Sequence, residues 1–175
     1  MKTFSKLSFA LLLSALSSVS MVAHAHASVE PSQVVEGRYA RLAVKLPHGC
    51  EGLPTDTVIV RLSPSFQGAK PMPKAGWDLK AVKSTLANPY DSHGKAITED
   101  VSEIIWSGGS LPSDFYDEFV FQAKVSSAPT TLLIPIEQKC GSKSIVWQGT
   151  SHDDAYPAAT LKVLPKTPAD MAHHH

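Results

Sequence analysis

The stretch Asp117-Glu-Phe-Val-Phe-Gln-Ala-Lys-Val125 decides the fold, because its polar and apolar residues alternate as in a half-buried β-strand. Phe119 and Phe121 share one face of such a strand, and Glu118 lies on the other face with Val120. Aromatic side chains on a single face favour packing against a core. The stretch therefore predicts a strand with one face turned towards a hydrophobic interior.

Runs of the same kind recur on both sides of this strand, separated by glycine- and proline-containing turns. The further expected strands are 27–31, 39–46, 57–62, the end of 95–106, 130–138, 144–148 and 160–164. We expect residues 66–80 to be extended or looped, and Ser107-Gly-Gly-Ser110 to break the strand before it. No segment has a convincing amphipathic helical pattern. The pattern predicts an all-β protein, a single antiparallel β-sandwich domain over residues 26–164.

The N-terminus has the features of a secretory signal peptide over residues 1–25. Lys2 and Lys6 form a charged tip, and the apolar run that follows is too short to span a bilayer. Small residues end the run, in two overlapping Ala-x-Ala sites. We therefore expect an exported, periplasmic protein whose leader is removed.

The position of cleavage decides what the mature N-terminus can bind. Cleavage after Ala25 makes His26 the first residue, whereas cleavage after Ala27 removes it. A first-residue histidine offers its α-amine and its ring Nδ1 to one ion, a chelate that an internal histidine cannot form. Nitrogen ligands favour Cu(II) over the other divalent first-row metals. The alternative is that these histidines are simply polar residues near a cleavage site.

Length and charge limit the other possibilities. Residues 26–175 are 150 residues, enough for one domain with a sizeable core. Two of the 16 Lys and Arg residues and none of the 16 acidic residues lie in the leader, so the exported chain has a net charge of −2 with neutral histidines. This balance argues against nucleic acid as a partner. No later apolar stretch reaches 18 residues, so we expect no transmembrane span in the mature chain.

Only two cysteines, Cys50 and Cys140, are present. In an exported chain they favour one disulfide over a cysteine metal site. Residues 165–175 are polar and are expected to form a flexible tail. Its final His173-His-His175 is open to two interpretations, a metal-collecting tail or an artificial tag.

Signatures of enzymes are missing from the chain. There is no G-x-S-x-G, H-E-x-x-H or P-loop motif, and no paired C-x-x-C. The sequence therefore does not predict an enzyme.

Several motifs in order carry a resemblance to a known family. They are His26-Ala-Ser-Val-Glu-Pro, Leu46-Pro-His-Gly-Cys-Glu-Gly-Leu-Pro-Thr, Pro73-Lys-Ala-Gly-Trp, Ile105-Trp-Ser-Gly-Gly, Tyr116-Asp-Glu-Phe-Val-Phe, Gln138-Lys-Cys-Gly and Val146-Trp. Together they make the chain resemble the YcnI-like exported copper-binding proteins from about His26 to Leu164. The resemblance implies an immunoglobulin-like β-sandwich, in agreement with the strand pattern.

The resemblance also implies a Cu(II) site with a single-histidine brace. On this basis His26 supplies amine and imidazole, Glu118 is the best carboxylate, and Trp147 is the nearby tryptophan. Glu30 and Glu137 are options for a second carboxylate. A further candidate ligand is His48, whose other role would be to order the loop beside Cys50.

The implied function is copper homeostasis, as a carrier or chaperone. Candidate partners, besides the copper ion, are other copper-handling proteins of the periplasm or membrane. One alternative is a copper oxidase resembling the polysaccharide monooxygenases. Their brace needs a second histidine, and nothing in the sequence puts His48, His93 or His152 there. The other alternative is a copper-free envelope interaction module.

Overall fold

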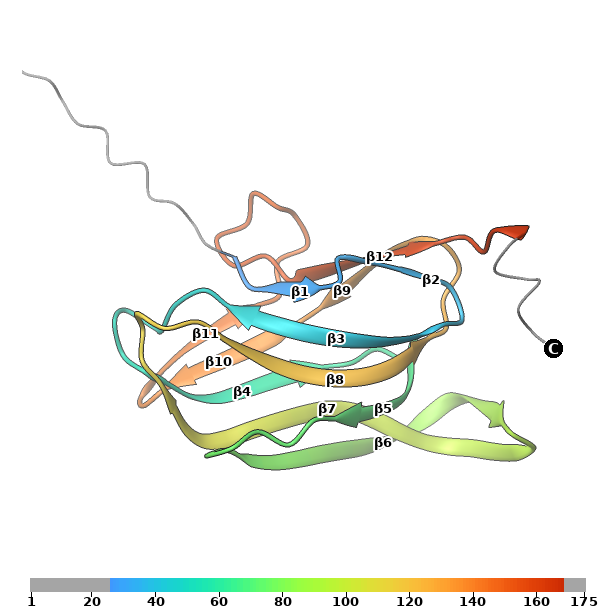
Figure 1. The fold of residues 1–175 in the computed structure, drawn as a ribbon, viewed down its shortest axis with the longest axis horizontal. Helices are drawn as coiled ribbons and strands as arrows, with labels where there is room; N and C mark the ends of the chain where they lie inside the picture. Colours follow the sequence, from blue (N-terminus) through green and yellow to red (C-terminus); the bar gives the residue numbers. More distant parts are fainter. Residues whose placement is uncertain (1–25, 169–175) are drawn as a thin grey trace, which may run out of the picture.

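The computed structural model describes residues 26–168, so the predicted signal peptide and His173 to His175 lie outside the described residues. All twelve regular elements in the described part are β-strands (Figure 1). They are β1 Ser28–Glu30, β2 Gln33–Val35, β3 Tyr39–Leu46, β4 Thr55–Arg61, β5 Phe66–Pro71, β6 Asp78–Ser92, β7 Lys95–Leu111, β8 Asp117–Val125, β9 Thr130–Ile134, β10 Ile136–Cys140, β11 Lys143–Trp147 and β12 Ala159–Leu164. The all-β prediction is confirmed.

The first sheet has the strand order β1-β3-β8-β5, and all of its neighbours are antiparallel. Strand β8 covers the predicted stretch 117–125, and its two phenylalanines, Phe119 and Phe121, are fully buried. Glu118 on the opposite face is only half-buried. Alternation in the sequence thus sets which face of this sheet meets the core.

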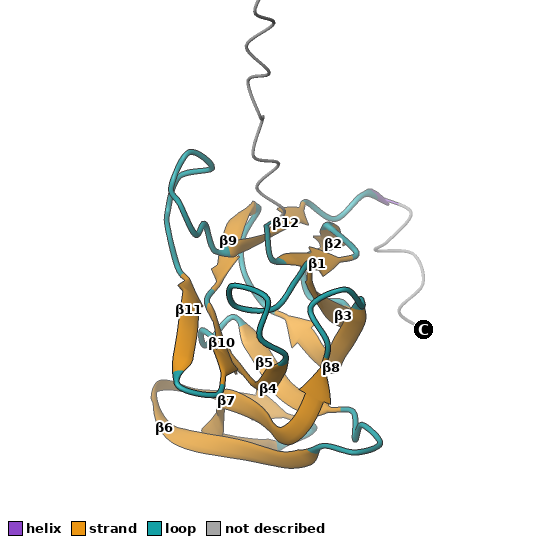
Figure 2. Ribbon diagram, turned by 90° about the vertical axis from the view of Figure 1, so that its left-hand side faces the viewer, coloured by secondary structure: helices purple, strands orange, loops and turns teal. Residues whose placement is uncertain are grey.

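The opposite layer has two parts, a sheet ordered β11-β10-β4-β7-β6 and a smaller sheet ordered β2-β12-β9. Strands β9 and β10 follow each other with only Pro135 between them and so belong one to each part. Strand β2 pairs with β12 in parallel, while β1 pairs with β3 in the first sheet. The N-terminal segment therefore crosses from one layer to the other within a few residues. Figure 2 shows β3 and β8 on one side of the molecule and β10 and β11 on the other.

The core lies between these layers, where apolar side chains of both meet. Trp106 of β7 packs edge-on against Phe119 of β8, with ring centroids 5.6 Å apart. Each fully buried large apolar side chain contributes roughly 1.5–3 kcal/mol relative to exposure. The predicted disulfide is confirmed at the edge of this core, since Cys50 and Cys140 are bonded with Cα atoms 5.8 Å apart.

Two expectations for residues 78–111 are wrong. Ser107-Gly-Gly-Ser110 does not end its strand, because β7 runs on to Leu111. The glycine is needed for packing: a Cβ on Gly109 would lie 2.0 Å from Cε2 of Trp77. Residues 78–92, for which no strand was expected, form β6 along β7.

The hairpin of β6 and β7 extends beyond the rest of the sandwich (Figure 1). Most of β6 is exposed or half-buried, so it lacks the regular apolar alternation that marks a strand in the sequence. Its pairing with β7 therefore depends mainly on the ladder, while Leu79 of β6 is partly buried against the core. Within residues 26–168 no helix is long and apolar enough to cross a membrane.

Candidate metal centre

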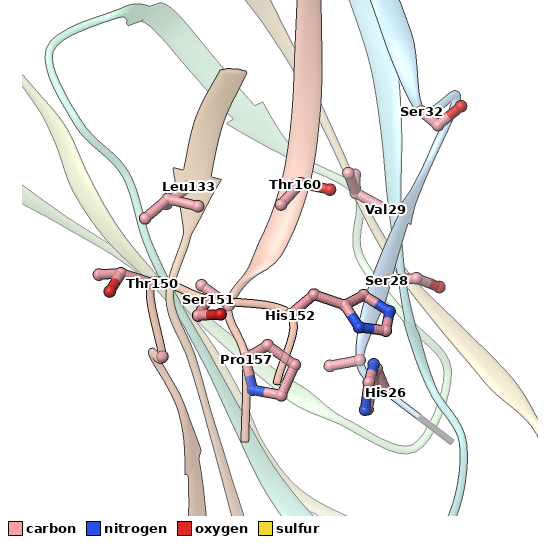
Figure 3. A pocket seen from close by; sticks show the side chains of 13 residues that line it. His26, Ser28, Val29, Ser32, Leu133, Thr150, Ser151, His152, Pro157 and Thr160 are labelled. Atoms are coloured by element: carbon pink, nitrogen blue, oxygen red, sulfur yellow. The ribbon is translucent and has the colours of Figure 1, made fainter. Parts of the chain in front are cut away.

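His26 lies two residues before the start of β1, at the end of the first sheet. Ala27 and Val29 are buried, and Ser28 between them is exposed. The two buried side chains hold the segment around His26 against the sandwich. The ring of His26 is near the ring of His152, with centroids 5.1 Å apart and planes at 72°. Figure 3 shows the two imidazoles side by side, although they come from opposite ends of the domain sequence.

A cavity of about 250 Å³ lies beside this histidine pair. Its walls come from β1, β9, β12 and the loop before β12, and they include Val29, Leu133 and Ala158 (Figure 3). Both histidines line it, together with small hydroxyl side chains. The cavity is thus mainly apolar, with imidazole nitrogens as its nitrogen-bearing side chains.

The loop 148–158, between β11 and β12, carries His152. The N–H of Gly149 donates to the Tyr156 carbonyl oxygen at 2.9 Å, which closes the base of the loop. A Cβ on Gly149 would lie 2.5 Å from Cβ of Asp154, so only glycine allows this close turn. The side chain of His152 is 87% exposed. A hydrogen-bonded loop therefore holds an exposed imidazole against His26.

Trp147, the predicted tryptophan of the site, is a core residue beneath this loop. It is 2% exposed, and its Nε1 donates to Oε1 of the buried Gln138 at 3.2 Å. The indole ring contacts Tyr156 edge-on at 5.3 Å and lies 6.2 Å from the ring of His48. Nε2 of the same Gln138 donates to the His48 carbonyl oxygen at 2.6 Å and to Oγ1 of Thr55 at 2.7 Å. This network orders the loop around His48.

Glu118, the predicted carboxylate, lies on the outer face of β8. The register aligns Ser28 of β1 with Lys45 of β3, and Lys45 with Glu118 of β8. Two strand spacings, about 10 Å, therefore separate Ser28 from Glu118. The carboxylate of Glu118 accepts hydrogen bonds from the hydroxyl of Tyr116 and, at 3.3 Å, from Arg41. The hydrogen bond from Tyr116 is the main reason that the pKa of Glu118 is lowered.

The same hydrogen bond raises the pKa of Tyr116 to about 12, because it favours the neutral phenol beside a carboxylate. Tyr116 and Glu118 are thus coupled to each other. Their side-chain partners within residues 26–168 are each other, Arg41 and Lys45, and not the two histidines.

The two optional carboxylates are also paired with cations. Glu30 forms an ion pair with Lys45, whose ammonium group therefore lies on the outer face between β1 and Glu118. Glu137 binds Arg61 at 2.6 Å and lies 3.5 Å from Lys139. The hydrogen bond from Arg61 is the main reason that the pKa of Glu137 is lowered. Neither carboxylate is next to His26.

The predicted residues consequently do not gather at one point. Within residues 26–168 no three His, Cys, Asp or Glu side chains lie close enough to hold a metal ion. The sequence places no second histidine beside His26, but in the structure the ring of His152 lies next to it. No local motif marks His152 in the sequence, since the proximity depends on β1 and β12 lying close together.

Comparison with protein families identifies the chain's relatives. The family described as "Domain of unknown function (DUF1775)" matches residues 26–163, which is nearly the whole sandwich. The chain belongs to the DUF1775 family. The match to this DUF1775 domain starts at His26, the residue that the predicted cleavage after Ala25 would expose.

Comparison with solved structures identifies the fold of this DUF1775 chain. An uncharacterized protein from Nocardia farcinica, reported with an immunoglobulin-like fold, superposes with a TM-score of 0.60 at 19% identity and covers 79% of this chain and 97% of its own. A putative membrane anchored protein from Corynebacterium diphtheriae matches with a TM-score of 0.39 at 12% identity, over 83% of this chain and 35% of its own. No curated protein matches the chain. The DUF1775 domain is an immunoglobulin-like β-sandwich.

Proposed function

We propose that this DUF1775 protein is exported to the periplasm and binds Cu(II) through His26 as its first mature residue. One observation carries the proposal: the family match begins at His26, directly after an expected leader ending in Ala23-His-Ala25. The YcnI-like copper-binding proteins, which the chain resembles, are the DUF1775 family. Cleavage after Ala25 would turn the amide of His26 into a free amine.

The donor set at this point fits Cu(II). The α-amine and the ring Nδ1 of His26 form a chelate of two nitrogens, and such ligands suit copper. His26 is half-buried beside a cavity and not enclosed in the core. An accessible ion with few protein ligands favours capture and hand-over, so we propose a carrier or chaperone in copper homeostasis and not an enzyme. Its partners would be other copper-handling proteins of the periplasm or membrane.

The other ligands implied by the resemblance are less well supported. A ligand role for Glu118 requires its carboxylate to leave Tyr116 and Arg41. Trp147 would have to act from beneath the loop 148–158, where it is buried. His26 is therefore the residue on which the proposal rests.

One added residue tests the proposal. A chain with an extra glycine ahead of His26 retains every side chain but has an amide in place of the α-amine. We expect its Cu(II) affinity to fall by about tenfold or more, because chelation by the amine is lost. Competition titration would compare this chain with one that begins at His26, with His173, His174 and His175 replaced by serine in both. Equal affinities would contradict the proposed N-terminal site.

A second candidate function is a copper oxidase, and one observation favours it. The brace of such enzymes needs a second histidine, and the ring of His152 lies 5.1 Å from that of His26. Oxygen consumption by the copper-loaded protein with a reductant would distinguish the oxidase from the carrier. Absence of copper in protein purified from the periplasm would instead favour the copper-free envelope module.

A further inference from the structure

The pair formed by His26 and His152 has a geometry that a single-histidine brace does not explain. We infer that His152 is a second imidazole ligand of the Cu(II) site, an inference that rests on the proposed function of His26. Two imidazoles on one ion, each with a ring nitrogen about 2 Å away, have centroids roughly 4.5–6 Å apart. The observed separation of 5.1 Å lies within this range.

The loop 148–158 holds His152 in this position without burying it. Tyr156 anchors the loop on the ring of Trp147, and the hydrogen bond from Gly149 to the Tyr156 carbonyl oxygen closes its base. At 87% exposure the imidazole of His152 contributes little to the core. A well-anchored loop thus presents an imidazole whose removal leaves the fold intact.

The orientation of the His152 ring also suits a ligand. Its Nδ1 lies 4.0 Å from a carboxylate oxygen of Asp153, a distance that is too long for a hydrogen bond and leaves both ring nitrogens available to an ion. Histidine ligands commonly have a carboxylate or carbonyl near the ring nitrogen that does not bind the metal. In a copper site bound through Nε2, Asp153 would be the carboxylate near the other ring nitrogen.

The third donor of the site is not a side chain. The amine of His26, its ring and the ring of His152 together supply three nitrogens. The amine explains how a copper site can form here although, within residues 26–168, no three His, Cys, Asp or Glu side chains lie close together. Three nitrogens and an adjoining cavity of about 250 Å³ leave room for an exchangeable ligand beside the ion.

The test compares two asparagine substitutions in the exported chain, with His173 to His175 replaced by serine. His152→Asn removes the proposed ligand. His93→Asn is the matched control, because His93 is exposed in the turn between β6 and β7 at a φ of 52°, a conformation that asparagine tolerates. Circular dichroism checks that both variants fold, competition titration gives the Kd for Cu(II), and pulsed EPR counts the imidazoles coupled to the ion.

We expect two coupled imidazoles in the parent chain and in His93→Asn, and one in His152→Asn. The Kd of His152→Asn should rise by about tenfold or more, and that of His93→Asn should be unchanged. A single imidazole in the parent chain, or an unchanged Kd for His152→Asn, would overturn the inference while His26 remained a copper ligand. A parent chain that begins at His26 and binds no copper would overturn the proposed function as well.

Discussion

At the scale of the residue, the hydrogen bond between Tyr116 and Glu118 couples two titrations on the outer face of β8. It raises the pKa of Tyr116 to about 12 from its usual 10.0 and lowers the pKa of Glu118 from its usual 4.5. The stabilisation due to Tyr116 is therefore complete below pH 10 and is lost as the pH rises towards 12. The stabilisation due to Glu118 is complete above its usual pKa of 4.5 and is lost as the pH falls through its lowered pKa in the folded protein.

Glu118→Gln should return the pKa of Tyr116 towards its usual value, because the negative charge beside the phenol is removed. Ultraviolet titration of tyrosinate absorbance measures this change. Tyr90 is an internal control, since its pKa of about 12 arises mainly from burial and should not move. If the pKa of Tyr116 were the same in Glu118→Gln and in the parent protein, the hydrogen bond would not persist in solution. The same variant tests Glu118 as a copper ligand, a role in which it should also raise the Kd for Cu(II).

Trp147→Phe should lower the free energy of unfolding by about 1–3 kcal/mol, because it leaves Oε1 of the buried Gln138 without the indole donor. Urea unfolding followed by circular dichroism gives the value. Tyr156→Phe is the control, since it keeps the edge-on ring contact with Trp147 and should change stability little. If Trp147→Phe instead kept full stability and altered the copper spectrum, the tryptophan would belong to the metal site.

At the scale of the element, β7 depends on a glycine for its packing against Trp77. That ring also packs edge-on against Phe119, with centroids 4.9 Å apart, so it has little freedom to move away. The glycine pair looks like a strand break in the sequence, but it provides space for an aromatic ring.

Gly109→Ala should destabilise the domain by about 1–3 kcal/mol, because its methyl group would overlap the Trp77 ring. Ser110→Ala, at the next and exposed position of β7, is the matched control and should be nearly neutral. Thermal unfolding measures both variants. Adding Trp77→Ala should relieve the overlap, so that Gly109→Ala costs less in that background. Equal midpoints for the two single variants would show that Trp77 moves aside without cost.

At the scale of the whole molecule, the disulfide joins the loop after β3 to the end of β10, across 90 residues of chain. Replacing both Cys50 and Cys140 by alanine should lower the free energy of unfolding by about 4 kcal/mol in the chain-entropy account. Urea unfolding of the variant and the parent protein tests this expectation. Reduction of the parent protein should give a similar loss. A negligible change in both would mean that the reduced chain retains enough structure to offset the missing crosslink.

The fold class follows from the sequence because period-two alternation is a local property of the chain. Residues 39–46 and 117–125 have it, and both are strands of the first sheet with apolar faces in the core. Strand β6 was not predicted, because its stability comes from pairing with β7 and not from an apolar face of its own. The disulfide could be predicted because a chain that is expected to be exported, and that has only two cysteines, offers one pairing.

The candidate site, like the fold, could be predicted only in part from the sequence. The sequence alone predicts that His26 follows a leader and could begin the mature chain, since cleavage signals are linear. Only the tertiary structure decided which residue faces His26, because β1 and β12 lie close together and the loop before β12 brings His152 beside its ring. Likewise, only the structure decided that Glu118 pairs with Tyr116 and Arg41, because these partners depend on strand register and side-chain direction across two strands.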